Sequence, residues 1–252
     1  MDGVPEIRIA ADPDALAEIA AHEVLEIALA AVAARERFTV ALAGGSTPRE
    51  TYERLARPPL SERMPWARTV VFFGDERGVP PAHAESNYGM AERALLSRVP
   101  IPADRVHRIP GEHADPEAVA ADYARRLGEV LGARRGEIPR LDLVLLGLGV
   151  DGHTASLFPG SPVLKESFRT VAAVHAAAAS IPQRFTLTYP VLNAAACVIY
   201  LVSGAEKAKV VKAALGDPAS ALPAARVRPV QGRLLWILDR AAASLLPSRR
   251  TS

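Results

Sequence analysis

Short runs of aliphatic and β-branched residues alternate with longer helical patterns along the whole chain, and this alternation limits the possible folds more than any other feature. The clearest run, Leu141–Gly147, is apolar at almost every position. A strand that is apolar on successive residues must be covered on both faces, which is typical of parallel strands between helices. The pattern therefore predicts an α/β fold, with a mostly parallel sheet flanked by helices in a single layered domain.

The expected elements follow from the hydrophobic period and from turn residues. Prolines gather only in short loop-like stretches and no internal repeat is visible, so we expect one domain over residues 1–252. We expect strands at Glu6–Ala10, Phe38–Ala43, Thr69–Gly74, Val106–Ile109, Leu141–Gly147, Arg169–His175, Arg184–Tyr189, Cys197–Ser203 and Leu234–Leu238, and helices at Pro13–Arg35, Pro48–Ala56, Tyr88–Arg98, Pro116–Gly132 and Ala205–Leu215.

Composition excludes several classes of protein. A single cysteine, Cys197, allows neither a disulfide framework nor a cysteine-based zinc cluster. No apolar run reaches the ~18 residues of a membrane span, and the first ten residues lack the pattern of a secretory signal. The net charge is only +2 and the basic residues are scattered, doubling at a chain end only at Arg249–Arg250. We therefore expect a cytoplasmic protein with neither membrane nor nucleic acid as a partner.

Ligands of open α/β sheets bind outside the carboxyl ends of the strands, so the residues just after each strand are the candidates for a site. The first such segment is Ala43–Glu50. Gly44 and Gly45 let the backbone approach a ligand closely, and Ser46 adds a hydroxyl before a helix start that attracts anions. The alternative is an ordinary strand-to-helix turn.

The same segment predicts how the next helix begins. Thr47 is expected as the N-cap, Pro48 as the first helical residue and Glu50 as the partner in a capping box. The segment is not a Walker A loop, because the Gly-Lys-Ser/Thr ending is absent. Pro48 also excludes a nucleophile elbow, which needs glycine at that position.

Three charged residues end the strand at Thr69–Gly74. Arg77 could meet an anion or a developing oxyanion, with Asp75 or Glu76 orienting it. A solvated strand end is the alternative.

The segment after Leu141–Gly147 contains the spacing G-x-G-x-x-G between Gly147 and Gly152. A dinucleotide site would need a longer helix next, and Pro159 cuts that helix short, so we reject NAD binding. His153 remains, exposed by glycines, with Asp151 two residues away to orient or polarise it. Histidine is the side chain best suited to proton transfer near pH 7.

The chain has only four lysines, and three of them fall between Lys207 and Lys212. Ser203 and Glu206 predict another capping box, which places Lys207 in the first helical turn. A cation there opposes the helix dipole unless an anion is bound. The alternative is a solvent-facing lysine, and Arg184, at the start of another strand, could be an ordinary edge residue.

These segments, in this order, resemble the glucosamine-6-phosphate isomerase/6-phosphogluconolactonase family over nearly the whole chain. The stretch Gly152–Pro159, Gly-His-Thr-Ala-Ser-Leu-Phe-Pro, is typical of the lactonase branch. The other matching segments are Gly44–Pro48, Gly74–Arg77, Ser86–Tyr88, Gly147–Gly152, Arg184–Thr188 and Ser203–Lys207. The resemblance implies the α/β sheet shared with glucosamine-6-phosphate deaminase and ribose-5-phosphate isomerase.

The resemblance also implies a function. The expected reaction is hydrolysis of 6-phospho-D-glucono-1,5-lactone, a phosphorylated sugar lactone, with no cofactor and no metal. The family's phosphate ligands correspond to Ser46, Arg184 and Lys207, beside Gly44 and Gly45. Its catalytic histidine corresponds to His153, a general base on water, with Asp151 and Arg77. A sugar-phosphate isomerase or deaminase and a non-enzymatic sugar-phosphate-binding module are the alternatives. We expect a monomer, with a dimer as the alternative.

Overall fold

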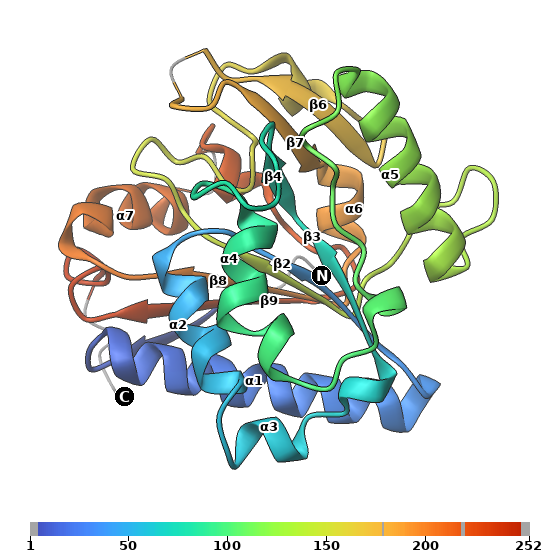
Figure 1. Ribbon diagram of the computed structural model, residues 1–252. Helices are drawn as coiled ribbons and strands as arrows, with labels where there is room; N and C mark the ends of the chain where they lie inside the picture. The colour runs from blue at the N-terminus through green and yellow to red at the C-terminus, as the bar shows by residue number, and fades with distance from the viewer. Residues whose placement is uncertain (1–4, 178, 218–219, 248–252) are drawn as a thin grey trace.

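The computed structural model describes residues 5–177, 179–217 and 220–247 (Figure 1). The predicted parallel sheet is present as six strands in the order β1-β9-β8-β5-β2-β3, all paired in parallel. The arginine pair at 249–250 lies outside the described residues. The six strands are β1 (Glu6–Ala10), β2 (Phe38–Leu42), β3 (Thr69–Phe73), β5 (Leu143–Leu146), β8 (Cys197–Val202) and β9 (Arg233–Asp239).

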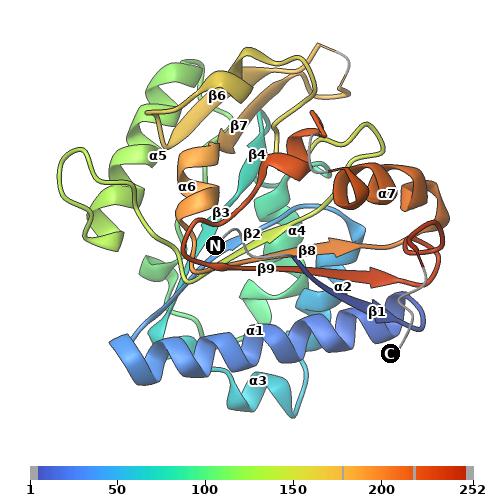
Figure 2. The same ribbon diagram turned by 180° about the vertical axis from the view of Figure 1, so that it is seen from behind.

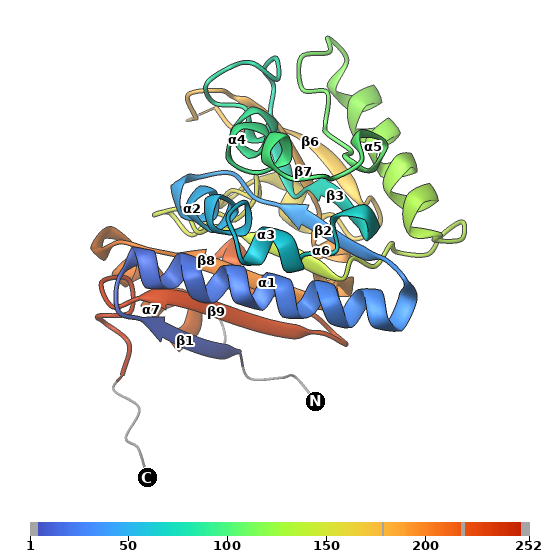
Figure 3. The same ribbon diagram turned by 60° about the horizontal axis from the view of Figure 1, so that its bottom comes forward.

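Helices cover both faces of this sheet, as the apolar strands require. The longest helix, α1, runs along one face, while α6 and α7 lie on the other (Figures 1 and 2). Figure 3 shows α1 extending along the strands β1 and β9. The helices are α1 (Pro13–Arg35), α2 (Ser46–Leu55), α3 (Leu60–Arg63), α4 (Asn87–Ala94), α5 (Pro116–Leu131), α6 (Tyr189–Ala194) and α7 (Ala208–Gly216), with 3-10 turns at Trp66–Arg68, Leu96–Arg98, Ala103–Arg105, Pro162–Lys165, Ala205–Lys207 and Pro223–Arg226.

Helix α1 has the predicted bounds because its ends are coded locally. Asp12 caps the helix by accepting a hydrogen bond from the backbone N–H of Ala15 at 2.8 Å, and Pro13 is the first helical residue. The helix is ended by its C-cap residue, Glu36, whose backbone is in the left-handed conformation with φ 56°.

A second, antiparallel sheet was not predicted. It consists of β4 (Asp75–Arg77), β7 (Gln183–Leu187) and β6 (Val171–His175), in that order, and α5 packs against β6. Gly74 joins the two sheets: its N–H donates to Leu42 and its carbonyl accepts from Leu187, both at 2.8 Å. The charged residues 75–77 thus form a strand of their own.

Several element predictions were wrong or had wrong bounds. The helix expected at Tyr88–Arg98 ends at Ala94, and the helix expected at Ala205–Leu215 begins as a 3-10 turn, with α7 starting only at Ala208. Val106–Ile109 is no strand, since it makes only an isolated bridge between Val106 and Val71. Tyr189 begins α6 and does not continue the strand before it. Helix α2 begins at Ser46, two residues earlier than predicted.

Candidate functional site

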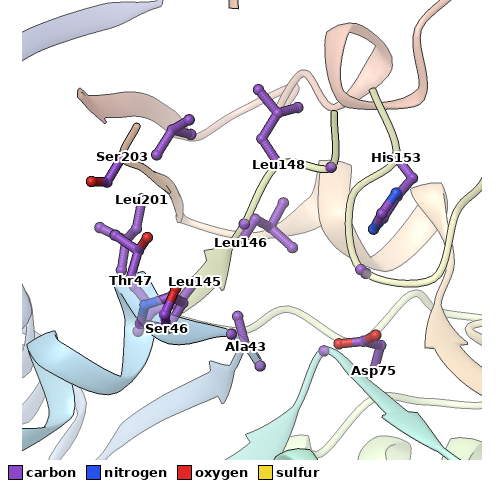
Figure 4. Close-up of a pocket in the computed structure, with 18 of the residues that line it drawn as sticks. Ala43, Ser46, Thr47, Asp75, Leu145, Leu146, Leu148, His153, Leu201 and Ser203 are labelled. Carbon is purple, nitrogen blue, oxygen red and sulfur yellow. The ribbon is translucent and has the colours of Figure 1, made fainter. Parts of the chain in front are cut away.

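A cleft of about 320 Å³ opens at the carboxyl ends of β2, β3, β5 and β8, where an open α/β sheet binds its ligands (Figure 4). Six of the eight predicted site residues line it: Gly44, Gly45, Ser46, Arg77, His153 and Lys207. The other two do not line it but contact residues that do: Asp151 is hydrogen-bonded to His153, and Arg184 lies opposite Arg77 in the β4–β7 pair. The remaining lining residues are Ala43, Thr47, Pro48, Gly74, Asp75, Leu145, Leu146, Gly147, Leu148, Gly149, Ala155, Leu201, Val202, Ser203 and Glu206.

The start of α2 forms one wall of the cleft. The N-cap is Gly45, with φ 104°, and no side chain caps the helix, so the predicted capping box with Thr47 as N-cap and Glu50 as its partner was wrong. The reason is that the chain turns at Gly45, whose positive φ suits glycine. The first N–H groups of the helix therefore lack a capping side chain at the edge of the cleft, an arrangement that attracts anions.

Arg77 reaches the cleft from β4. Its Nη1 donates to the carbonyl of Glu85 at 2.5 Å, and its Nε is buried with no hydrogen-bond partner among the described residues. The carboxylate expected to orient Arg77 was that of Asp75 or Glu76. Glu76 accepts a hydrogen bond from the backbone N–H of Arg77 at 2.8 Å, and no hydrogen bond joins it to the Arg77 guanidinium among the described residues. The backbone of Glu85 holds the guanidinium instead.

Glu76 has a structural role that the sequence analysis did not predict. Its side chain is buried, and its carboxylate accepts the backbone N–H groups of Arg77, Asn87 and Tyr88 at 2.7–2.8 Å and the hydroxyl of Ser86 at 3.1 Å. Burial raises the pKa of Glu76, and the N–H donors oppose that rise. Glu76 thereby ties the start of α4 to the strand that carries Arg77. The signal was present in the sequence, as the paired motifs at 74–77 and 86–88.

Asp75 adds a carboxylate to the cleft wall. It is buried, and its two oxygens accept from the Asn87 amide at 3.0 Å and the Ser156 hydroxyl at 2.8 Å. A side chain at Gly44 would overlap the same amide, since a Cβ there would stand 1.8 Å from Asn87 Oδ1. Glycine at 44 therefore lets the Asn87–Asp75 pair approach the loop before α2.

His153 and Asp151 form a hydrogen-bonded pair. Nδ1 of the imidazole lies 2.5 Å from Oδ1 of Asp151, which also accepts the backbone N–H of His153 at 3.1 Å. Burial raises the pKa of Asp151, but the hydrogen bonds and charge of His153 outweigh it and leave the pKa lowered. An ionised Asp151 favours the tautomer with the proton on Nδ1, which leaves Nε2 as the basic nitrogen.

The loop that carries this pair is closed by its own backbone. The N–H of Gly149 donates to the carbonyl of His153 at 2.8 Å, and the N–H of Gly152 donates to Gly149 at 3.0 Å. The ring of Phe158 packs beside the imidazole, with 4.6 Å between the two ring centroids. Because these two glycine N–H groups already have acceptors, they are not free to bind an oxyanion.

Lys207 ends the 3-10 turn at Ala205–Lys207 that precedes α7, on the opposite side of the cleft. The predicted capping box of Ser203 and Glu206 was wrong, because the N-cap is Gly204 and no side chain caps the turn. The Ser203 hydroxyl donates instead to Asp239 at 2.7 Å. Asp239 is buried at the end of β9 and also accepts the N–H of Gly204 at 3.1 Å, so it holds the loop that presents Lys207.

Arg184 is buried on β7 directly opposite Arg77 on β4. Its Nε donates to the carbonyl of Ile181 at 2.6 Å. Burial, followed by the charge of Arg77, lowers the pKa of Arg184. The carboxylates of Asp75, Glu85 and Glu76 act in the opposite direction and partly offset the repulsion between the two guanidinium groups.

Among the described residues, no group of three or more histidine, cysteine, aspartate or glutamate side chains could hold a metal ion. Within the same residues, no helix combines the length and the apolar character that crossing a bilayer requires.

The fold and the cleft together define an α/β protein with a polar site at its strand ends, built from a helix start, two basic side chains and a His–Asp pair. The model of the family described as glucosamine-6-phosphate isomerases/6-phosphogluconolactonase matches residues 11–236. The chain belongs to that family.

Similar proteins agree with this assignment. A 6-phosphogluconolactonase from Rattus norvegicus is 47% identical over 219 residues, 84% of this chain and 82% of the relative. The structure of 6-phosphogluconolactonase from Trypanosoma cruzi has a TM-score of 0.86 and 35% identity, covering 98% of each chain. A monomeric glucosamine-6-phosphate deaminase, 23% identical with a TM-score of 0.78 over 95% of this chain and 99% of its own, shares the fold. The fold shared with that deaminase is thus confirmed, and the likeness to ribose-5-phosphate isomerase stays a prediction.

Proposed function

We propose that this chain hydrolyses 6-phospho-D-glucono-1,5-lactone to 6-phospho-D-gluconate, the lactone step of the oxidative pentose phosphate pathway. One observation carries the proposal: a hydrogen-bonded His153–Asp151 pair faces the same cleft as an uncapped helix start and Lys207. The names of the similar proteins support it, since they are 6-phosphogluconolactonases.

The phosphate group is held at one end of the cleft. The first N–H groups of α2, the Ser46 hydroxyl and the Lys207 ammonium group supply donors and positive charge there. Arg184 adds positive charge from behind the lining, beside Arg77. Gly44 and Gly45 keep the wall free of side chains, so the phosphate can approach the backbone.

The chemical step begins with a water molecule next to His153. Nε2 takes a proton from that water as the oxygen attacks the lactone carbonyl, and the carbonyl becomes a tetrahedral oxyanion. Asp151, at 2.5 Å from Nδ1, stabilises the imidazolium that forms. The ring C–O bond then breaks, and the imidazolium returns the proton to the leaving ring oxygen, which gives the open-chain acid.

Arg77 stabilises the oxyanion. The N–H groups of Gly149 and Gly152 are occupied within their loop, whereas the Arg77 guanidinium lines the cleft as a cationic donor. A preformed cation at that position needs no rearrangement during the reaction. The steps use water and side chains of this chain, and no cofactor enters them.

The proposed setting is the cytoplasm, with the chain acting as a monomer on a small phosphorylated substrate. Neither a membrane nor a nucleic acid is a proposed partner, which is consistent with the net charge of +2. Sedimentation of the purified protein tests the monomer, and a dimer mass would contradict it.

The deciding experiment is an assay of acid release from the phosphorylated lactone, measured above the spontaneous rate. Release that scales with enzyme concentration supports the proposal, and its absence overturns it. The same preparation is given glucosamine 6-phosphate, and ammonia release there would assign the chain to the deaminase branch. Binding of 6-phosphogluconate without turnover of either compound would identify a non-enzymatic binding module.

A further inference from the structure

The segment Leu222–Ala224 carries no recognisable motif, yet it packs against the loop that bears His153. The backbone N–H of Ala224 donates to the carbonyl of Gly152, the residue just before His153, at 3.1 Å. The Leu222 side chain lies against the same glycine: a Cβ on Gly152 would stand 2.6 Å from Leu222 Cδ2. Gly152 also has φ 86°, so the loop depends on glycine at this contact.

Two tyrosine hydroxyls hold this segment from its other side. Tyr189, the first residue of α6, donates to the carbonyl of Pro223 at 3.0 Å. Tyr200, in the middle of β8, donates to the carbonyl of Ala224 at 3.2 Å. Ala224 therefore bonds through its carbonyl to the sheet and through its N–H to the His153 loop.

Tyr200 is well suited to anchor this connection. It is fully buried, and its ring stacks on Trp236 of β9 at 4.0 Å between centroids and 15° between planes. Thr154, the residue just after His153, is held separately at the end of β5. Thr154 is itself fixed, because its hydroxyl donates to the carbonyl of Gly147 at 2.9 Å.

The loop needs such an anchor because much of it faces solvent. Val150 is 64% exposed, and Asp151 is exposed as well. The hydrogen bonds within the loop fix its internal shape but do not fix its position relative to the cleft. That position is fixed by contacts to the two neighbours of His153: Gly152 accepts from Ala224, and Thr154 donates to Gly147.

We propose that Tyr200 is a positioning residue for His153. It acts through Ala224, and together with Leu222 it holds the loop at the distance from the cleft that proton transfer requires. The inference rests on the role of His153 in the proposed function. It also gives a role to the segment Leu222–Ala224, whose sequence carries no recognisable motif.

The test removes one hydroxyl. Tyr200→Phe deletes the bond to Ala224 and keeps the ring, and Tyr123→Phe is the matched control. Tyr123 is also buried, and its hydroxyl bonds only to Phe73 and His107 in the described structure. Hydrogen exchange is measured on peptides covering residues 147–158 and 203–212, and kcat and KM are measured with the phosphorylated lactone.

We expect Tyr200→Phe to speed exchange in 147–158 but not in 203–212, and to lower kcat about tenfold with KM unchanged, because small misplacements of a catalytic group are costly. Tyr123→Phe should leave both readouts at the wild-type level. Leu222→Ala, with Tyr200 intact, should also speed exchange in 147–158.

The inference is overturned if Tyr200→Phe leaves exchange of 147–158 unchanged, or if both tyrosine variants lower kcat equally. Exchange is read without substrate, so it tests the anchor even if wild-type protein does not hydrolyse the lactone. A wild-type protein that does not hydrolyse the lactone would overturn the proposed function alone.

Discussion

Replacing Gly149 by alanine should disable the proposed base by a single steric contact. A Cβ at this position would stand 2.1 Å from His153 Nδ1, 2.2 Å from its Cε1 and 2.6 Å from Asp151 Oδ1. Gly149 is not among the glycines with positive φ, so alanine adds no backbone strain there. The imidazole must retreat by at least about 1 Å, a displacement that can cost ~10²-fold in rate.

The expected loss in kcat/KM corresponds to about 2.7 kcal/mol of transition-state stabilisation. Initial rates of acid release from the phosphorylated lactone measure it, and calorimetry with 6-phosphogluconate should show unchanged binding, because the contact lies away from the phosphate end of the cleft. The mechanism of the loss is checked in a second background. In Gly149→Ala/His153→Ala the added methyl group has no imidazole to displace, so the double variant should match His153→Ala.

Two results would refute this reasoning. Wild-type turnover in Gly149→Ala would show that the pair tolerates the methyl group or that its geometry does not matter. A further loss in the double variant, as large as in the single one, would show that Gly149 acts on something other than His153.

Three further predictions follow from the same structure. His153→Ala should lose most turnover while binding 6-phosphogluconate normally, and turnover at the wild-type level would exclude His153 as the base. Lys207→Ala should chiefly raise KM for the phosphorylated lactone; an equal effect on an unphosphorylated lactone would contradict its phosphate role. Backbone N–H groups of Arg169 and Phe168, then the Arg169 guanidinium, lower the pKa of Glu166 to about 2, from an ordinary 4.5. Its charge therefore stabilises the fold fully above about pH 4.5, and this stabilisation is lost as the pH falls through about 2. Glu166→Gln should lower Tm at pH 7, by less at about pH 3 and hardly at all at about pH 2, and a constant difference in thermal melts would disprove it.

The elements that the sequence predicted well are those coded by neighbouring residues. Helix α1 has its capping aspartate, its proline and its apolar face within one continuous segment, and its bounds agree with the prediction. The central strands β3, β5 and β8 are predicted by their nearly continuous apolar sequences. Because carboxyl ends of parallel strands meet at one edge, six predicted site residues were found together in one cleft.

The predictions failed where a polar side chain bonds to a distant segment. Ser203 has the local pattern of a helix cap, but its hydroxyl bonds to Asp239, and no local rule tells the two partners apart. Asp75 and Glu76 resemble a solvated strand end until the backbone N–H groups and the amide around Asn87 are placed on them. Burial of these carboxylates depends on tertiary partners, which a single sequence does not reveal.

The pairing of the first strand with the last has a consequence for synthesis of the protein. Ile7 lies beside Trp236 and Ala10 beside Asp239. Strand β1 can therefore pair with β9 only after almost the entire chain has been synthesised. Until β9 emerges, the nascent chain exposes an unpaired edge of β8 and lacks both the aromatic partner of Tyr200 and the carboxylate that holds the Lys207 loop. We therefore expect a chain truncated before β9 to expose an unpaired apolar strand edge and to aggregate, because exposed strand edges and apolar surface favour association.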